Sequence, residues 1–293
     1  MNEKVKEQKL EIEKLETFEL KDIFECGQCF RWNIQADGSY IGVFGNNVMQ
    51  VQMQGNHILF KGICEKNIEE TVKEYFDLER NYEEIQSILS NIDGNLKTSI
   101  EYGKGIRILN QDLWETIISF IISANNNIPR IKGIIERLSQ KYGTEIKWRQ
   151  HTYYTFPTPE QLKDVTIEKF RELGLGFRDK RVFETTHNIL DGKINLEELK
   201  NEKNTLKVRE KLLELPGVGP KVADCILLFS TLKRLEVFPI DVWVRRVMND
   251  LYIKKDDETK VNNKTILKLA ESKFGNLAGI AQQYLFYWKR ESA

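Results

Sequence analysis

Residues Leu212–Val247, LLELPGVGPKVADCILLFSTLKRLEVFPIDVWVRRV, contain a helix end, a glycine turn and a second helix in succession. A helix over 207–214 is followed by Pro216 and Gly217-Val218-Gly219, and a largely apolar helix begins near Pro220. Two glycines two residues apart form a tight turn in which backbone N–H groups can approach a ligand. Because these groups lie at a helix N-terminus, they favour an anion such as a phosphate. An ordinary connector between two helices would also explain the turn.

The second helix of this stretch carries a lysine in its first turn. Lys221 and Cys225 are four residues apart and therefore project from one face, while Val222, Ile226 and Phe229 form an apolar stripe for the core. The helix dipole disfavours an ammonium at this end, and a partly dry site would make the neutral, nucleophilic amine accessible. The alternative is a lysine that extends along the surface, as most lysines do.

An aspartate follows this helix in the segment 238–241, FPID. Asp241 is placed as the N-cap of a helix over 242–251. A carboxylate held by N–H groups stays ionised, so it could stabilise a cation that develops nearby. Capping alone is the ordinary role of such a residue.

Helix, LPGVG turn, helix and PIDVWVRRV together resemble the helix-hairpin-helix DNA glycosylases, with the hairpin over 207–233 and the aspartate loop over 238–242. A lysine at 221 marks the bifunctional members, and the similarity is greatest to the 8-oxoguanine glycosylase/lyase family. The resemblance implies excision of 8-oxoguanine from duplex DNA by base flipping, a Schiff base at Lys221 and β-elimination. Asp241 would stabilise the oxocarbenium-like charge.

The same resemblance implies how the hairpin region binds DNA. Gly217, Val218 and Gly219 would hold a phosphate through their N–H groups, and the backbone of 215–219 could bind a monovalent cation. Trp243 stands where known members have a phosphate-binding histidine. Its indole N–H can donate one hydrogen bond but carries no charge.

A second motif lies near the N-terminus. Residues 26–32, CGQCFRW, resemble the GQ-x-FRW segment of the family. The resemblance implies that the backbone carbonyl of Gly27 accepts the N7–H of the oxidised base, a proton that guanine lacks. A guanine would leave this acceptor unpaired, which costs a few kcal/mol. Considered alone, Gly27 could equally be a glycine at the end of a strand.

Two further motifs resemble the segments that enter the duplex. Residues 111–124, QDLWETIISFIISA, are apolar almost all round and predict a buried helix, which is followed by NNNIPR. The resemblance implies that Asn125 fills the space of the extruded base and that Arg130 contacts the orphaned cytosine, although Pro129 replaces a small residue. In RELGLGFRDKR, residues 171–181, Phe177 would be a wedge and Arg178 a second reader of the opposite base.

The last motif is a helix over 278–288 that contains AQQYLF. Gln282 and Phe286 lie on one face of this helix. The resemblance implies that the glutamine reads the Watson–Crick edge of the flipped base and that the phenylalanine stacks on it, whereas packing in the core would also explain the phenylalanine. The implied base pocket consists of Gly27, Cys225, Pro239, Gln282 and Phe286.

Length, charge and periodicity predict an α+β protein of two parts. Residues 17–63 read as an antiparallel meander, with strand-like runs at 30–35, 40–45, 48–54 and 57–63. Helices follow at 67–78 and 82–91, and 94–105 reads as a segment that crosses into the helical part. We therefore expect an N-terminal antiparallel domain over 1–102 and a two-lobed helical glycosylase domain over 103–293.

The charge of the chain is unevenly distributed although the net charge is zero. Residues 1–100 carry 11 Lys/Arg against 18 Asp/Glu, whereas residues 101–293 carry 33 against 26. We therefore expect a phosphate-facing surface on the second part. The partner implied by the resemblance is duplex DNA with 8-oxoguanine opposite cytosine, bound by a monomer.

Several other classes of protein are disfavoured. The charged N-terminus has no apolar signal region and no apolar run reaches 18 residues, so we expect an intracellular protein, in a prokaryotic cytoplasm or nucleoid or in a eukaryotic nucleus. Cys26 and Cys29 form a CxxC without a second ligand pair, and we expect no cofactor and no catalytic metal. A glycosylase for another damaged base, or a non-catalytic DNA-binding module, remains an alternative.

Overall fold

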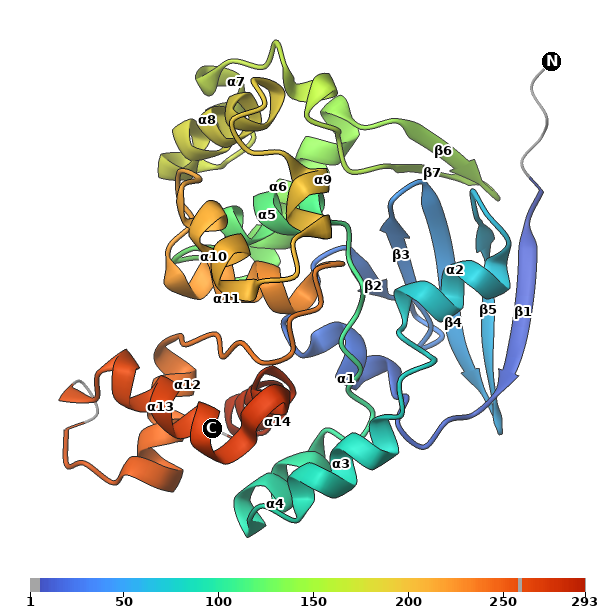
Figure 1. The fold of residues 1–293 in the computed structure, drawn as a ribbon. Coiled ribbons are helices and arrows are strands. Elements are labelled where there is room, and N and C mark those ends of the chain that lie inside the picture. Colours follow the sequence, from blue (N-terminus) through green and yellow to red (C-terminus); the bar gives the residue numbers. More distant parts are fainter. Residues whose placement is uncertain (1–5, 258–259, 293) are drawn as a thin grey trace.

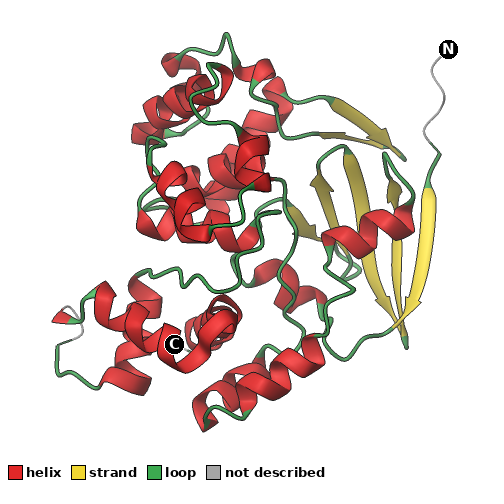
Figure 2. Ribbon diagram, viewed as in Figure 1, coloured by secondary structure: helices red, strands yellow, loops and turns green. Residues whose placement is uncertain are grey.

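Five strands near the N-terminus form an antiparallel sheet in the order β1-β5-β4-β3-β2, drawn yellow in Figure 2. The computed structural model describes residues 6–257 and 260–292. The strands are β1 (Gln8–Glu13), β2 (Trp32–Ile34), β3 (Tyr40–Phe44), β4 (Asn47–Gln54) and β5 (His57–Ile63). The four strands predicted from the sequence are confirmed, and β1 is an additional edge strand in which Leu10 lies opposite Phe60.

One face of the sheet is covered by two short helices, α1 (Leu20–Glu25) and α2 (Ile68–Tyr75) (Figure 1). The helix at 20–25 lies inside the range predicted to be strand-like, so that part of the prediction is wrong. An aromatic core fills this side of the sheet, where the rings of Phe24 and Trp32 stack at 4.2 Å between centroids. This core fixes α1, and with it the segment that follows at 26–29.

The other face of the sheet is covered by a two-stranded ribbon that comes from the helical part. The ribbon consists of β6 (Glu145–Trp148) and β7 (His151–Tyr154). Successive strand residues face opposite sides, so Val43 and Val48 point away from the aromatic core and pack with Trp148. The sequence did not predict this ribbon, which is one of the links between the two parts of the chain.

Helices α3 (Tyr82–Ser90) and α4 (Gly94–Tyr102) pack beside the C-terminal helix α14 (Ala278–Glu291) (Figure 1). The helix predicted at 82–91 is confirmed, whereas the crossing segment predicted at 94–105 is mostly helical. Leu89, Leu96 and Ile100 belong to the core of the helical part. Cys26 and Phe30 belong to the same core, whereas Leu109 belongs to the core of the sheet, so the two cores do not divide at a single point of the chain. The domain boundary at residue 102 stays a sequence-based proposal.

The remaining helices build the rest of the helical part around the buried helix α5. They are α5 (Leu113–Ser123), α6 (Ile128–Tyr142), α7 (Ile167–Glu172), α8 (Asp179–Leu190), α9 (Leu196–Asn201), α10 (Thr205–Leu213), α11 (Pro220–Phe229), α12 (Val242–Met248) and α13 (Asn263–Phe274). In α5 nine residues are buried, which confirms the prediction for 111–124. A π-helical turn over Asn249–Ile253 extends α12. No helix of the described ranges is long and apolar enough to cross a membrane.

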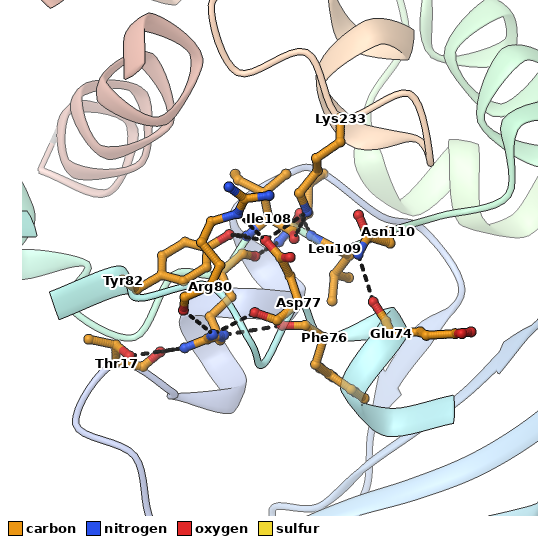
Figure 3. Close-up of polar contacts among 12 residues, drawn as sticks. Thr17, Glu74, Phe76, Asp77, Arg80, Tyr82, Ile108, Leu109, Asn110 and Lys233 are labelled. Atoms are coloured by element: carbon orange, nitrogen blue, oxygen red, sulfur yellow. Dashed lines mark hydrogen bonds and ion pairs between the residues drawn. The ribbon is translucent and has the colours of Figure 1, made fainter. Parts of the chain in front are cut away.

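A buried polar network joins the two parts of the chain (Figure 3). The guanidinium of Arg107 donates to Thr17 Oγ1 at 3.0 Å and to the carbonyl oxygen of Asp77 at 2.6 Å. Lys233, which lies just after α11, donates to the carbonyl oxygen of Ile108 and is 3.3 Å from Asp77 Oδ2. The end of α11 is therefore fixed to the N-terminal part.

Candidate active site

The predicted hairpin is present between α10 and α11 (Figure 1). Gly217 has φ +89°, and a Cβ atom there would meet the side chain of Arg181 at 2.8 Å, so the turn requires glycine on both counts. Gly219 is the N-cap residue of α11, with Pro220 in the first turn. The N-terminal N–H groups of α11 are thereby available at the hairpin.

An ion pair between the two hairpin helices holds them together. Arg209 Nε lies 2.7 Å from Asp224 Oδ1, and the Asp224 side chain is only 7% exposed. Burial raises the pKa of Asp224, although the guanidinium of Arg209 opposes this shift. The pair fixes the position of α11 and therefore of Lys221.

Lys221 and Asp241 line one small cavity, of about 40 Å³. The same cavity is lined by Gly27, Cys225, Pro239, Gln282 and Phe286, so the structure brings together every residue predicted for catalysis and for the base pocket. Three lining residues were missed from the sequence: Phe120, Phe229 and Gln283. The first two belong to buried helices whose periodicity indicated only core packing.

Contacts within the cavity define the surroundings of the lysine. The ammonium of Lys221 lies 5.4 Å from the centroid of the Phe120 ring. Burial raises the pKa of Cys225 to about 11, so this thiol stays protonated at neutral pH and offers a compact apolar surface. Asp241 caps α12 as predicted, because its Oδ1 accepts from the N–H of Val244 at 2.8 Å.

The amide of Gln282 is the clearest indication of a ligand in the cavity. Gln282 is 4% exposed, and its Oε1 is buried with no hydrogen-bond partner among the described residues. An unpaired buried acceptor costs about 1–3 kcal/mol. Such a cost is removed when a ligand donates to the oxygen.

Gly27 approaches the predicted stacking residue. Gly27 has φ +86°, and a Cβ atom at this position would lie 3.5 Å from the Phe286 ring and 3.3 Å from Arg290 Nη1. The guanidinium of Arg290 is 5.2 Å from the centroid of that ring. Glycine therefore gives the cavity a backbone wall beside Phe286, and the role of the Gly27 carbonyl stays a prediction.

The asparagine motif forms a turn with an unusual backbone conformation. Asn125 has φ +51°, a left-handed conformation that is uncommon for residues other than glycine. Asn127 caps α6 by accepting from the N–H of Arg130 at 3.1 Å. Pro129 lies in the first helical turn, where it removes an N–H that has no helical partner, so it is compatible with the start of α6.

Phe177 and Arg178 occupy very different environments. Phe177 is 53% exposed, as a wedge must be. Arg178 is 1% exposed, and its guanidinium donates to the carbonyl oxygens of Ala124 at 2.9 Å and Asn125 at 2.7 Å. In this structure Arg178 supports the Asn125 turn. Its role as a reader of the opposite base stays a prediction and requires the guanidinium to leave these carbonyls.

Trp243 and the two cysteines of the CxxC are the remaining residues singled out in the sequence. Trp243 is half-buried in the first turn of α12, and the guanidinium of Arg246 lies 5.5 Å from its ring centroid. Cys26 and Cys29 are both buried, and burial raises the pKa of the Cys26 thiol to about 11. Within 6–257 and 260–292 no cluster of three or more His, Cys, Asp or Glu residues has the arrangement of a metal site.

A glycine hairpin at the start of a helix, a lysine in the first turn of that helix and an aspartate cap in the same cavity are the features of a helix-hairpin-helix DNA glycosylase. Residues 118–272 match the HhH-GPD superfamily of base excision DNA repair proteins. Residues 9–117 match the N-terminal domain of 8-oxoguanine DNA glycosylase. The chain belongs to the HhH-GPD superfamily and carries the N-terminal domain of its 8-oxoguanine glycosylase members.

Individual relatives agree with this assignment. The chain is 32% identical over 250 residues to a probable N-glycosylase/DNA lyase of Methanothermobacter thermautotrophicus. The aligned region covers 78% of this chain and 77% of that protein. A crystal structure of the Clostridium acetobutylicum 8-oxoguanine glycosylase/lyase, bound to duplex DNA with cytosine opposite 8-oxoguanine, superposes with a TM-score of 0.91. It is 44% identical, over 99% of this chain and 98% of that one. A structure of MBOgg1 with a low-affinity DNA ligand is 42% identical and also has a TM-score of 0.91, over 97% and 96% of the two chains.

Proposed function

We propose that this protein excises 8-oxoguanine from duplex DNA and then cleaves the strand at the resulting abasic site. The observation that carries the proposal is the shared cavity of Lys221, Asp241 and the unpaired amide of Gln282. A nucleophile, a carboxylate and a buried hydrogen-bonding group at one point are what excision of a flipped base requires.

The exposed residues around the cavity support binding of a kinked duplex. Gly217 and Gly219 hold a backbone phosphate through N–H groups at the start of α11, where a monovalent cation could assist. The N–H of Val218 donates to the carbonyl oxygen of Leu215 at 3.0 Å, so the phosphate contact predicted for Val218 is not available in this structure. Phe177 enters the stack as a wedge and Asn125 occupies the space of the extruded nucleotide. Arg130, which lies in the first turn of α6 just after the Asn125 turn, contacts the orphaned cytosine.

The lesion is recognised inside the cavity. Gln282 hydrogen-bonds the Watson–Crick edge of the base, which lies between Phe286 and Cys225, with Pro239 at the rim. The backbone carbonyl of Gly27 accepts the N7–H of 8-oxoguanine, whereas guanine would place an acceptor against it. The cavity of about 40 Å³ holds only a few water molecules, so a purine enters when lining side chains change rotamer.

The chemistry uses the amine of Lys221 in its neutral form. The nitrogen lone pair bonds to C1′ of the sugar while the bond from C1′ to N9 breaks and its electron pair leaves with the base. The carboxylate of Asp241 stabilises the positive charge that develops on the sugar. The nitrogen next loses a proton and forms a double bond to C1′ while the C1′–O4′ bond breaks and O4′ takes up a proton, which opens the sugar and gives the Schiff base. The Schiff base acidifies the C2′ proton, and loss of that proton expels the 3′ phosphate by β-elimination.

Borohydride trapping tests the proposal directly. The reagent reduces the Schiff base, so wild-type protein should form a covalent adduct with a duplex that contains 8-oxoguanine opposite cytosine. Lys221→Gln should abolish the adduct. Lys73→Gln, which removes an exposed lysine paired with Glu69 on α2, should leave it unchanged. An adduct that persists in Lys221→Gln would show that another group is the nucleophile.

A further inference from the structure

The Gly27 carbonyl is the one group of the proposed pocket that separates 8-oxoguanine from guanine, and it belongs to the backbone. No side-chain rotamer can aim it. Its direction depends on how the peptide groups on either side are held, and the positive φ of Gly27 gives that backbone unusual freedom. The following inference rests on the proposed function and concerns the residues that restrain this segment.

Two glutamines hold the carbonyls on either side of Gly27. Gln283 Nε2 donates to the carbonyl oxygen of Cys26 at 2.6 Å. Gln111 Nε2 donates to the carbonyl oxygen of Gln28 at 2.7 Å. The carbonyl of Gly27 therefore lies between two backbone acceptors that are each fixed by a side-chain amide.

Each glutamine also connects this segment to a helix that bears other pocket residues. Gln283 is 2% exposed and follows Gln282 directly on α14. Gln111 donates a second hydrogen bond to the carbonyl oxygen of Phe229 at 3.0 Å, at the end of the helix that carries Lys221. The backbone of Gln111 adds to this link by accepting from the N–H of Thr231 at 2.8 Å. These two amides thus link the segment around Gly27 to α11 and to α14.

Another buried glutamine makes similar hydrogen bonds at a position away from the cavity. Gln86 is also buried and also makes two hydrogen bonds through Nε2, to the carbonyl oxygen of Lys104 at 2.8 Å and to the hydroxyl of Tyr284 at 2.9 Å. It joins α3 to α14 and does not line the cavity. Gln86 therefore provides a control with the same chemistry and a purely structural position.

We propose that Gln111 and Gln283 are positioning residues for lesion discrimination, which aim the Gly27 carbonyl at the N7–H of 8-oxoguanine. Loss of either amide frees one flanking peptide group to rotate. The Gly27 carbonyl is then no longer held in the direction that favours binding of 8-oxoguanine over guanine. The contacts to the phosphates and to the opposite strand are unaffected.

The test compares binding of two duplexes in a Lys221→Gln parent, which retains no excision activity. Gln111→Met and Gln283→Met keep an unbranched side chain of similar length and remove the donor. Fluorescence anisotropy gives Kd for duplexes with 8-oxoguanine or guanine opposite cytosine. Each substitution should reduce the preference for 8-oxoguanine by about tenfold, through weaker binding of the damaged duplex alone. Gln86→Met should lower the melting temperature and leave the preference unchanged.

A second measurement separates positioning from general damage to the fold. With Lys221 restored, both methionine variants should still form the borohydride adduct on a duplex with an abasic site, which has no base to discriminate. An unchanged preference in both variants, or an equal loss of trapping on the abasic duplex, would overturn the inference. A parent without any preference for 8-oxoguanine would instead overturn the substrate assignment, and this inference with it.

Discussion

At the scale of single residues, Asp241 combines a structural role with an electrostatic one. Its Oδ1 caps α12 through the N–H of Val244, and its carboxylate lines the cavity with Lys221. Capping requires an oxygen that accepts a hydrogen bond, whereas stabilising a positive charge on the sugar requires the negative charge of the carboxylate. An asparagine keeps an oxygen that can cap the helix but removes the negative charge, so this substitution separates them.

Asp241→Asn should slow base release much more than it weakens DNA binding. Removal of one preorganised electrostatic group costs about 10²–10³-fold in rate, whereas the cap is retained. Single-turnover excision with 8-oxoguanine opposite cytosine gives the rate, and anisotropy with the same duplex in the Lys221→Gln background gives the affinity. If rate and affinity fell by equal factors, Asp241 would be only a structural cap.

At the scale of elements, the ion pair between Arg209 and Asp224 fixes the crossing of α10 and α11. The two residues are 15 positions apart, and their contact depends on how the hairpin folds, so no local pattern predicts it. Arg209→Met should destabilise the protein by about 3–5 kcal/mol, because it leaves a buried carboxylate unpaired. Urea unfolding at pH 7 measures this loss.

The pH dependence of that loss identifies its cause. Burial raises the pKa of Asp224, and in Arg209→Met the opposing guanidinium is gone. The folded variant then binds a proton more readily than the unfolded chain, so its stability falls as the pH rises from 5 to 8. The double variant Arg209→Met/Asp224→Asn should regain part of the stability at pH 8. A loss that is the same at pH 5 and pH 8 would point to packing alone.

Elements with a run of buried apolar residues were predictable, whereas short elements with many charged residues were not. The apolar run at 111–124 predicts α5, and the short apolar run within 57–63, which follows a Gly-Asn turn signal, predicts β5. The edge strand β1 (QKLEIE) was missed because it is short and half charged, which is how edge strands avoid aggregation. The helix at 94–102 was obscured by glycines at its ends, and the ribbon at 145–154 is anchored mainly by Trp148.

The residues of the candidate site divide into those placed by a local motif and those placed by contacts between distant segments. Residues within local motifs, such as Lys221 and Gln282, were predictable because a short segment of chain places them. The burial of Arg178 against the Asn125 turn was not, since it depends on contact between α8 and the end of α5. Gln111 and Gln283 were missed for the same reason, because their partners lie 83 and 257 residues away.

At the scale of the whole molecule, the base pocket exists only because the two parts of the chain are held together. Gly27 follows the helix on the sheet, whereas Lys221 and Gln282 come from the helical part. Asp77 and Lys233 pair between these parts (Figure 3), and Arg107 donates to the carbonyl oxygen of Asp77. Lys233 has φ +50° and Asp77 has φ +52°, so both residues adopt a costly backbone conformation at this junction.

Lys233 should make the stability of this junction depend on pH. Burial lowers the pKa of Lys233 from its ordinary value of 10.5 to about 7, because the loss of hydration outweighs the attraction of Asp77. Between pH 7 and 10.5 the unfolded chain therefore binds a proton that the folded protein does not. Folding stability attributable to Lys233 must rise with pH across this window, since its full cost is present below pH 7 and disappears above 10.5.

Lys233→Met removes this titration and leaves Asp77 paired with Arg80, whose Nε lies 2.6 Å from Asp77 Oδ2. Urea unfolding of both proteins at a series of pH values from about 6 to 9 isolates the lysine, because the other titrating groups largely cancel in the difference. The wild type should gain stability relative to the variant as the pH rises above 7. Parallel curves would mean that Lys233 keeps its proton throughout, and that the attraction of Asp77 offsets the cost of burying the charge.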